Sequence, residues 1–314
     1  MKRLRIVFMG TPEFAVASLQ AIMATEHQVV GVITAPDKPA GRGRKLHESA
    51  VKKYAMAQGL NVLQPSNLKD PEFLESLKEL QADLQVVVAF RMLPKQVWEM
   101  PPLGTFNLHA SLLPEYRGAA PINWAIINGE NLTGVTTFYI NEDIDTGAII
   151  KQAAVEISRS DTAGDLHDKL MRIGSQTVVE TIEKIEKGNI SPQKQQSGQF
   201  KAAPKLNKEN CRIQWENSAE SIYNQVRGLS PYPGAWTYLE NNGSRIELKI
   251  YRAEVLNEDH ELEPGMLSVS KKNIRVAVKD GFIDIMDLKM SGKKRMDAKS
   301  LLNGYEFHAG CKLF

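Results

Sequence analysis

The stretch LRIVFMGTPEFAVASLQAIM, residues 4–23, decides the fold class. Its apolar start, residues 4–9, predicts a buried β-strand, and Gly10 then turns the chain. Thr11 is the expected N-cap of a helix, and Pro12 suits the first helical position. The apolar residues that follow recur at the spacing of one helix face. A strand, a tight turn and a helix form the first half of a βαβ unit, so the sequence predicts an α/β domain.

Apolar runs and helical patterns keep alternating up to residue 188. Asp161 is the expected cap of the last and longest helix. The alternation predicts a doubly wound, Rossmann-like sheet. The first turn lacks the Gly-x-Gly-x-x-Gly pattern and no Walker A sequence is present, so neither a dinucleotide nor a nucleoside triphosphate is indicated. The expected strands are 28–34, 84–90, 105–108, 135–140 and 148–157, and the expected helices are 71–80, 95–100, 119–128 and 161–188.

The sequence pattern changes after residue 189. The segment 189–205 contains prolines, a glycine and four glutamines without periodicity, which is typical of a linker. Beyond it, short apolar runs separated by Asn-Gly, Pro-Gly and Asp-Gly turns predict a smaller, OB-like β-barrel. We therefore expect a doubly wound N-terminal domain over 1–189, a linker over 190–207 and a C-terminal β-barrel domain over 208–314.

Length and composition agree with two globular domains in 314 residues. No apolar run approaches the roughly 18–20 residues of a membrane helix. The N-terminal apolar run ends in a turn and lacks the features of a signal peptide, so a cytoplasmic location is expected. Cys211 and Cys311 could pair once, but two buried free thiols in a reducing compartment are the favoured interpretation.

The net charge is +2, from 39 basic and 37 acidic side chains, so charge alone requires no polyanionic partner. Basic residues nevertheless gather in two stretches, 37–53 and 289–299. Each stretch is either a local grip on a phosphate backbone or a solvated surface run. The basic residues are Lys38, Arg42, Arg44, Lys45, Lys52 and Lys53 in the first stretch, and Lys289, Lys293, Lys294, Arg295 and Lys299 in the second.

Polar side chains gather at the end of the strand expected at 105–108. Asn107 and His109 are two residues apart on an extended segment, so they project from one face. Ligands of open α/β sheets bind at the carboxyl ends of strands. An Asn amide can donate to a developing oxyanion, and a neutral imidazole can accept a proton from an attacking amine. Each residue alone is also compatible with a purely structural role.

A carboxylate is expected beside these two residues. Asp145 follows the strand expected at 135–140, and we expect it to reach the same sheet edge from a parallel position. There it would orient His109 and help to move a proton, although it could equally stabilise a turn before Thr-Gly. The six histidines show no His-x-x-x-His spacing and the cysteines no Cys-x-x-Cys spacing, so no metal site is predicted.

Five stretches carry a resemblance to a known family. They are GTPEFA (10–15), PDKPAGRGRKL (36–46), NLHASLLPEYRGAAPI (107–122), DTG (145–147) and VRGLSPYPGAWT (226–237). In these stretches the chain resembles the methionyl-tRNA formyltransferases, and the resemblance covers essentially its whole length. The Asn-x-His-x-Ser-Leu-Leu-Pro motif marks the wider family of 10-formyltetrahydrofolate-dependent enzymes. The basic loop and the second domain narrow the resemblance to the tRNA enzymes.

The resemblance implies a site, residue by residue. Asn107, His109 and Asp145 match the catalytic trio. The residues at 90–91 and 143–144 depart from those commonest in the family. The implied folate contacts are Ser111, Leu112, Leu113 and Pro114 in one loop, with Phe90 and Met92 in the segment 88–94. The implied tRNA contacts are Arg42, Lys38, Arg44 and Lys45, with Lys293, Lys294 and Arg295 from the second domain.

The implied activity is transfer of a formyl group from 10-formyltetrahydrofolate to the α-amino group of initiator methionyl-tRNA, for translation initiation. The resemblance further implies a cytoplasmic monomer that needs no metal. Two alternatives stay open. A member of the wider family could act on a small amine, such as a nucleotide sugar or glycinamide ribonucleotide. A protein of another class could bind tRNA with a catalytic site that has decayed.

Overall fold

The computed structural model describes residues 3–40 and 45–314. Contacts between residues divide the chain into two compact units, which are described separately below. Two short segments that precede residue 167 in the sequence belong to the second unit. Unit 1 comprises Met1–Gly118, Thr133–Val155 and His167–Ala202, and unit 2 comprises Ala119–Leu132, Glu156–Leu166 and Ala203–Phe314.

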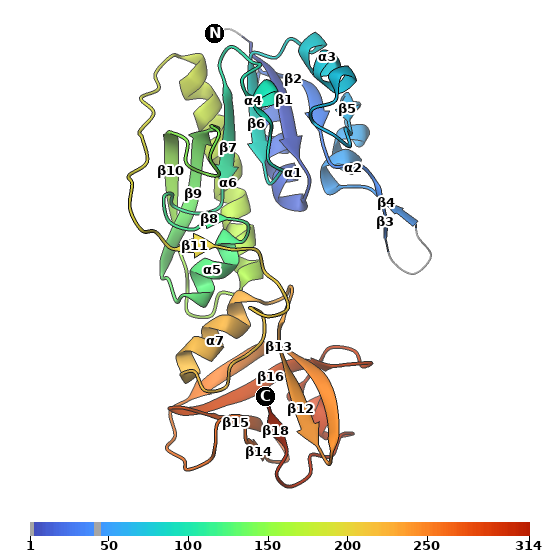
Figure 1. The fold of residues 1–314 in the computed structure, drawn as a ribbon, viewed down its shortest axis with the longest axis vertical. Helices are drawn as coiled ribbons and strands as arrows, with labels where there is room; N and C mark the ends of the chain where they lie inside the picture. The colour runs from blue at the N-terminus through green and yellow to red at the C-terminus, as the bar shows by residue number, and fades with distance from the viewer. Residues whose placement is uncertain (1–2, 41–44) are drawn as a thin grey trace. The chain divides into compact units, whose positions relative to one another are not determined.

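Unit 1 contains a sheet whose described strands follow the order β10-β9-β7-β6-β1-β2-β5 (Figure 1). From β5 to β7 neighbouring strands run parallel, and the order reverses at β1. β9 pairs antiparallel with β7. The expected doubly wound sheet is therefore confirmed. Its strands are β1 (Arg5–Gly10), β2 (Gln28–Ile33), β5 (Val62–Leu63), β6 (Leu84–Val88), β7 (Thr105–His109), β9 (Leu132–Tyr139) and β10 (Ile149–Glu156).

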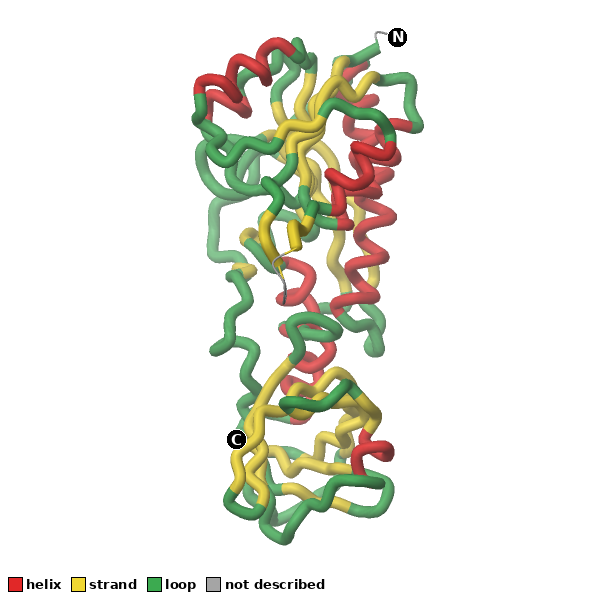
Figure 2. The backbone as a smooth tube through the Cα atoms, turned by 90° about the vertical axis from the view of Figure 1, so that its right-hand side faces the viewer, coloured by secondary structure: helices red, strands yellow, loops and turns green. Residues whose placement is uncertain are grey.

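Helices cover both sides of this sheet, as Figure 2 shows. Successive residues of a strand point to opposite faces, so each face has its own core. On one face Met9 and Val87 pack with Leu77 of α3. On the other, Leu108 lies so close to α6 that a Cβ on Gly174 would be 2.9 Å from its Cδ2. The helices are α1 (Glu13–Met23), α2 (Ala50–Ala57), α3 (Pro71–Glu79), α4 (Lys95–Trp98) and α6 (Ala163–Glu186).

Two helix starts differ from the expectation. The N-cap of α1 is Pro12, which makes no side-chain cap hydrogen bond, so Thr11 is not the cap. At α6 the Thr162 hydroxyl accepts the N–H of Asp165 at 3.2 Å, and the Asp165 carboxylate accepts the N–H of Thr162 at 2.9 Å. This reciprocal capping box takes the place of the expected Asp161 cap. The Asp161 carboxylate accepts the N–H of Ser158 instead.

The sheet of unit 2 follows the order β14-β15-β16-β13-β12-β18, with β17 paired to β16. Neighbouring strands are antiparallel, and a bridge between Met266 and Lys312 joins the two ends of this path. The sheet thus curls into a nearly closed barrel, as predicted. The elements are α7 (Ala219–Gly228), β12 (Ala235–Asn241), β13 (Ser244–Leu256), β14 (Leu267–Val269), β15 (Ile274–Val278), β16 (Gly281–Met290), β17 (Met296–Asp297), α8 (Ala298–Leu302) and β18 (Lys312–Leu313).

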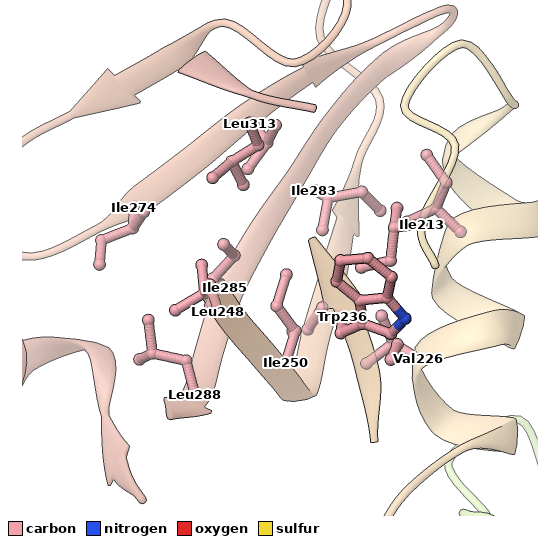
Figure 3. Close-up of a cluster of buried hydrophobic side chains, with 14 of the residues drawn as sticks. Ile213, Val226, Trp236, Leu248, Ile250, Ile274, Ile283, Ile285, Leu288 and Leu313 are labelled. Atoms are coloured by element: carbon pink, nitrogen blue, oxygen red, sulfur yellow. The ribbon is translucent and has the colours of Figure 1, made fainter. Parts of the chain in front are cut away.

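The barrel encloses the apolar core drawn in Figure 3. Ile250 of β13 and Ile285 of β16 belong to it, together with Val226 of α7. The buried indole of Trp215 donates its N–H to the hydroxyl of Thr237 at 3.0 Å, so no polar atom of this large side chain is left unpaired.

The remaining short elements of the chain are β3 (Lys38–Ala40), β4 (Lys45–His47), β8 (Arg117–Gly118), α5 (Pro121–Ile127) and β11 (Ala202–Ala203).

Cys211 and Cys311 both lie in this core as buried free cysteines, which confirms the prediction. Burial raises the pKa of each thiol above its usual range, and a protonated thiol is a poor nucleophile. Among the described residues, no group of three or more His, Cys, Asp or Glu side chains is placed to hold a metal ion. No helix within residues 3–40 and 45–314 has the length and apolar character needed to cross a membrane.

We expect Ile250→Ala to lower the free energy of unfolding by about 2–5 kcal/mol, because this fully buried side chain would leave a cavity in the barrel. Urea denaturation followed by circular dichroism measures the change. Arg252→Ala, at an exposed position of the same strand, is the matched control and should change the free energy by less than about 0.5 kcal/mol. Equal losses in the two variants would contradict this placement of the core.

Candidate active site

The end of β7 forms the centre of the candidate site. Asn107 and His109 are separated by one residue of the strand, so they project from the same face of the sheet. The register places Asn107 beside Val87 of β6, and residues paired across neighbouring strands share a face. Val87 belongs to the core beneath α3. Both polar side chains therefore lie on the α3 face, opposite to α6.

The imidazole of His109 is held from two sides and is 7 % exposed. Its Nε2 lies 2.9 Å from the backbone oxygen of Tyr116, and because a carbonyl only accepts, Nε2 carries the proton in the neutral ring. Nδ1 is then an acceptor, 3.7 Å from Oδ2 of Asp145. A proton that arrives at Nδ1 creates an imidazolium beside this carboxylate. The geometry thus leaves Nδ1 as the ring nitrogen that can accept a proton.

Asp145 reaches His109 by a route that differs from the expected one. β9 runs antiparallel to β7, so its end lies beside Phe106, near the start of β7. The expectation of a parallel strand end at the same sheet edge is therefore wrong. The chain after β9 turns back over the face of the sheet. A Cβ on Gly147 would lie 1.6 Å from the backbone oxygen of Tyr139, so only glycine permits this close approach.

The backbone of Asp145 is left-handed, with φ at 55°. This conformation costs a non-glycine residue roughly 1–2 kcal/mol, although Asp tolerates it better than most. The N–H of Gly118 donates to Oδ2 of Asp145 at 3.0 Å. The amide of Gln195 donates to the backbone oxygens of Asp145 and Gly147, each at 2.9 Å. Since each hydrogen bond contributes about 1 kcal/mol net, these contacts offset the cost of the backbone conformation.

Sequence reasoning missed Gln195, because it lies in a segment whose composition predicts a linker. Gln195 is 8 % exposed, whereas its neighbours from 191 to 199 are all exposed. Its Oε1 accepts hydrogen bonds from Nε and Nη2 of Arg117, at 3.1 and 2.5 Å. The guanidinium of Arg117 also lies over the ring of Phe200, 5.8 Å from the centroid. A single buried glutamine among exposed polar residues leaves no periodic signal in a sequence.

The side-chain amide of Asn107 is available to bind a ligand. The residue is half-buried, and no group within the described part of the chain hydrogen-bonds to its side chain. An amide N–H that points from a strand end can donate to an oxygen that gains negative charge during a reaction. The face therefore presents a hydrogen-bond donor and a proton acceptor two residues apart.

The loop after β7 is fixed by Thr136, which pairs with His109 across the strands. The buried Thr136 hydroxyl donates to the backbone oxygen of Ser111 at 2.7 Å and accepts the N–H of Leu113 at 3.0 Å. The amide of Gln152 donates to the Leu113 oxygen at 2.9 Å. The loop is therefore held by buried hydrogen bonds from Thr136 of β9 and by a partly buried one from Gln152 of β10. Of its four candidate folate contacts, Ser111 and Leu113 are buried, and Leu112 and Pro114 are half-buried.

The segment after β6 lies on the same side of the sheet. Phe90 packs against the α3 core, and the Arg91 guanidinium lies 5.6 Å from the centroid of its ring. Arg91 also donates to the backbone oxygens of Pro65 and Ser66. Phe90 and Arg91, which depart from the family pattern, thus form a cation–π pair, and Arg91 is hydrogen-bonded to a neighbouring loop.

An ion pair joins this segment to the loop after β9. Lys95 Nζ lies 3.2 Å from Oε1 of Glu142. Each of the two joined segments carries an exposed apolar side chain, Met92 at 65 % and Ile144 at 61 %.

The cations of the first basic stretch are only partly described. Lys38 is exposed in β3. Arg42 and Arg44 lie outside the described residues, and for Lys45 only the backbone position in β4 is described. Lys52 forms ion pairs with two carboxylates of its own stretch, so its charge is balanced there.

The second basic stretch is more completely described. Arg295 donates to both oxygens of Asp287, with Nη2 2.7 Å from Oδ2, so its charge is balanced within the barrel. Lys293 and Lys294 are exposed, and no described carboxylate lies within ion-pair distance of either. Lys293 Nζ lies 5.1 Å from the centroid of the Tyr305 ring. Since no described carboxylate balances either charge, both exposed ammonium groups suit a phosphate.

Comparison with known proteins decides the family. The model described as "Formyl transferase" matches residues 4–182, and the model described as "Formyl transferase, C-terminal domain" matches residues 205–306. Methionyl-tRNA formyltransferase of Flavobacterium johnsoniae is 57 % identical over 315 residues, which cover 100 % of both chains. The chain belongs to the methionyl-tRNA formyltransferase family. The Bacteroides fragilis member is 51 % identical over 99 % of this chain and 98 % of its own.

Solved formyltransferases share the fold of this methionyl-tRNA formyltransferase family member. The N-formyltransferase from Helicobacter canadensis, solved with folinic acid and dTDP-3-aminofucose, has a TM-score of 0.67 and 25 % identity, covering 90 % of this chain and 98 % of its own. The sugar 3N-formyl transferase WlaRD, solved with dTDP and 5-N-formyl-THF, has a TM-score of 0.65 and 23 % identity, covering 94 % and 100 %. The sugar enzymes are thus far more distant in sequence than the tRNA enzymes.

We expect Thr136→Val to lower the free energy of unfolding by about 1–3 kcal/mol, because it leaves the buried N–H of Leu113 without its acceptor. Amide hydrogen exchange should become faster at Leu113. Thr136→Ser keeps the hydroxyl and is the matched control, with most of the protection retained. If the Val and Ser variants exchange at the same rate, Thr136 does not hold the loop.

Proposed function

We propose that this protein transfers the formyl group of 10-formyltetrahydrofolate to the α-amino group of initiator methionyl-tRNA, and so supplies formylmethionyl-tRNA for translation initiation. The observation that carries the proposal is the His109–Asp145 pair, at 3.7 Å, on the face that also presents the spare amide of Asn107. Full-length relatives named methionyl-tRNA formyltransferase support the acceptor. We further propose that the protein acts as a monomer in the cytoplasm.

The proposed reaction begins when the amine attacks the formyl carbon and a new C–N bond forms. The side-chain N–H of Asn107 donates to the oxygen, which becomes an oxyanion in the tetrahedral intermediate. The attacking nitrogen gives one proton to Nδ1 of His109, and the Asp145 carboxylate stabilises the resulting imidazolium. His109 then gives this proton to the departing folate nitrogen as its bond to carbon breaks. The ring returns to its neutral form, and the proton lost by the amine ends on the folate product.

We propose that the folate lies against the two loops that follow β6 and β7. Buried hydrogen bonds from Thr136 and a partly buried one from Gln152 hold the second loop. The exposed side chain of Met92 offers an apolar surface for a flat ring system. The related N-formyltransferase from Helicobacter canadensis was solved with folinic acid, which supports a folate as the ligand class. The proposed contacts are Ser111, Leu112, Leu113, Pro114, Phe90 and Met92.

We propose that the two basic stretches hold the tRNA backbone. Small residues between the cations of the first stretch, Gly41 and Gly43, suit a loop that approaches a nucleic acid closely. The exposed charges of Lys293 and Lys294, which no described carboxylate balances, suit phosphates in the second stretch. The proposed contacts are Arg42, Lys38, Arg44 and Lys45, with Lys293, Lys294 and Arg295 from unit 2.

The direct test of the function is transfer of labelled formyl from 10-formyltetrahydrofolate to methionyl-tRNA. Glycinamide ribonucleotide and an amino-sugar nucleotide serve as parallel acceptors. We expect formylation of methionyl-tRNA and no comparable rate with the small amines. Preference for a small amine would assign the protein to another branch of the family. No transfer to any of the acceptors would leave only a binding function.

We expect Asn107→Ala to lower the chemical rate about 10²–10³-fold and His109→Ala about 10²–10⁴-fold, because they remove the oxyanion donor and the proton acceptor. Asp145→Asn should also be slow, since an amide does not neutralise an imidazolium. Single-turnover formylation measures each rate, and a filter assay measures tRNA affinity, which should change little. A variant with near-parental turnover would remove its residue from the mechanism.

We expect Arg42→Ala to weaken productive binding of methionyl-tRNA and to reduce the salt dependence of binding by roughly one charge. A salt series of formylation rates measures this slope. Lys69→Ala, at an exposed position outside both basic stretches, is the control and should keep the parental slope. Parental rates for Arg42→Ala at every salt concentration would show that the loop does not contact tRNA.

A further inference from the structure

We call the segment 190–203 the strap. It forms hydrogen bonds with both loops that contact His109, the loop after β7 and the loop after β9. The backbone of Gln193 pairs with Ile149 through two hydrogen bonds of 2.8 Å, just after the loop that carries Asp145. The backbone oxygen of Lys201 accepts the N–H of Tyr116 at 2.6 Å, and Tyr116 supplies the carbonyl that fixes Nε2 of His109. The strap is therefore anchored on either side of the candidate catalytic pair.

Gln195 lies between these two anchors, and its amide orientation is fixed by its partners. A guanidinium only donates, so Oε1 of Gln195 must face Arg117. The two N–H groups then face the backbone oxygens of Asp145 and Gly147, which only accept. One side chain thus satisfies three partners from two different loops.

Apart from Gln195, the loop that carries Asp145 is held mostly by exposed contacts. Within the loop, the Thr146 hydroxyl lies 3.0 Å from Oδ1 of Asn141 and 3.2 Å from the backbone oxygen of Asp143. Residues 141–144 are exposed. The ion pair between Lys95 and Glu142 is itself exposed to solvent, where such pairs contribute little. Toward the site, the Asp145 carboxylate accepts the N–H of Gly118. The direction of this carboxylate therefore depends on how the backbone at 145–147 is held, and Gln195 is the buried side chain that holds it.

We propose that Gln195 is a positioning residue for the reaction: by donating to the backbone at Asp145 and Gly147, it keeps the Asp145 carboxylate facing Nδ1 of His109 during proton transfer. The inference rests on the proposed function of the His109–Asp145 pair. Gln195 touches neither substrate nor the reacting atoms in this arrangement. Its effect comes from geometry, and a displacement of about 1 Å at a catalytic group can cost about 10²-fold in rate.

Two substitutions at Gln195 distinguish the hydrogen bonds that its amide oxygen accepts from those that its N–H groups donate. Gln195→Glu keeps an oxygen for Arg117 and nearly the same size, but it has no N–H for the backbone oxygens. Gln195→Met removes the contacts on both sides. Gln196→Met, at the exposed neighbouring position, is the matched control. All variants are made in the full chain, and circular dichroism and thermal melting confirm that each is folded.

We expect Gln195→Glu and Gln195→Met to lower the single-turnover formylation rate by comparable factors, about 10–10²-fold, with KM for methionyl-tRNA and for the folate changed less than about threefold. Gln196→Met should keep the parental rate. Combined with Asp145→Asn, either substitution should cause little further loss, because both changes act on the same step. Should the Met variant fail to fold, the Glu variant alone provides the test.

Three results would overturn the proposal. Parental turnover in Gln195→Glu would mean that the contact with Arg117, and not donation to the loop, is what matters. A raised KM with an unchanged rate would make Gln195 a binding residue. If the rate losses of a Gln195 variant and of Asp145→Asn are fully additive in the double variant, the role of Gln195 is merely structural. If Asp145→Asn itself keeps the parental rate, the proposed function of the pair fails, and that outcome is distinct from failure at Gln195 alone.

Discussion

The left-handed backbone at Asp145 is the constraint on which the candidate site depends. β9 ends beside the start of β7, whereas His109 lies at the end of β7. The chain after β9 must therefore run back along the face of the sheet before the Asp145 carboxylate can reach His109. A positive φ at Asp145 and the bare backbone of Gly147 against Tyr139 allow this return. Hydrogen bonds from Gly118 and Gln195 keep the unusual conformation populated. Without this return, the sheet would present an imidazole with no carboxylate beside it.

Successive residues of the central strands have different roles on the two faces of the sheet. Thr136 holds the loop after β7 on the α3 face, while its neighbour Thr137 shares a hydrogen bond of 2.8 Å with Thr181 of α6 on the other. In the same way, Asn107 and His109 point toward the site, and Leu108 packs on the α6 side. On the face with the long helix, Leu108 and Val135 pack closely against Gly174 of α6. This packing gives the polar face a rigid base, which catalysis by positioned groups requires.

Much of the fold could be predicted from periodicity and turn chemistry. Buried runs followed by helical patterns indicated the doubly wound sheet, and closely spaced turn dipeptides indicated the barrel. The shared face of Asn107 and His109 followed from the two-residue period of a strand. Their match to a known catalytic motif, rather than any pattern of spacing, supplied the roles proposed for them.

Other features lay beyond sequence reasoning for identifiable reasons. The apolar run of β9 fits a parallel or an antiparallel neighbour equally well, so the path of Asp145 could not be derived from it. Asp161 and Thr162 are adjacent residues that can both cap a helix, and only the reciprocal bonds with Asp165 distinguish them. Gln195 is one of several glutamines in a polar segment, and only its burial and its three partners separate it from the others.

The strap also restricts where chains of this kind can change in length. Gln193 is paired to Ile149 in antiparallel register, and Gln195 must reach Asp145 from two residues further on. An insertion or deletion of one residue between them would turn a different side chain toward the loop. Residues 196–199, by contrast, are exposed between the buried glutamine and the next anchor. Related chains can therefore vary in length at 196–199 while the spacing from 193 to 195 stays fixed.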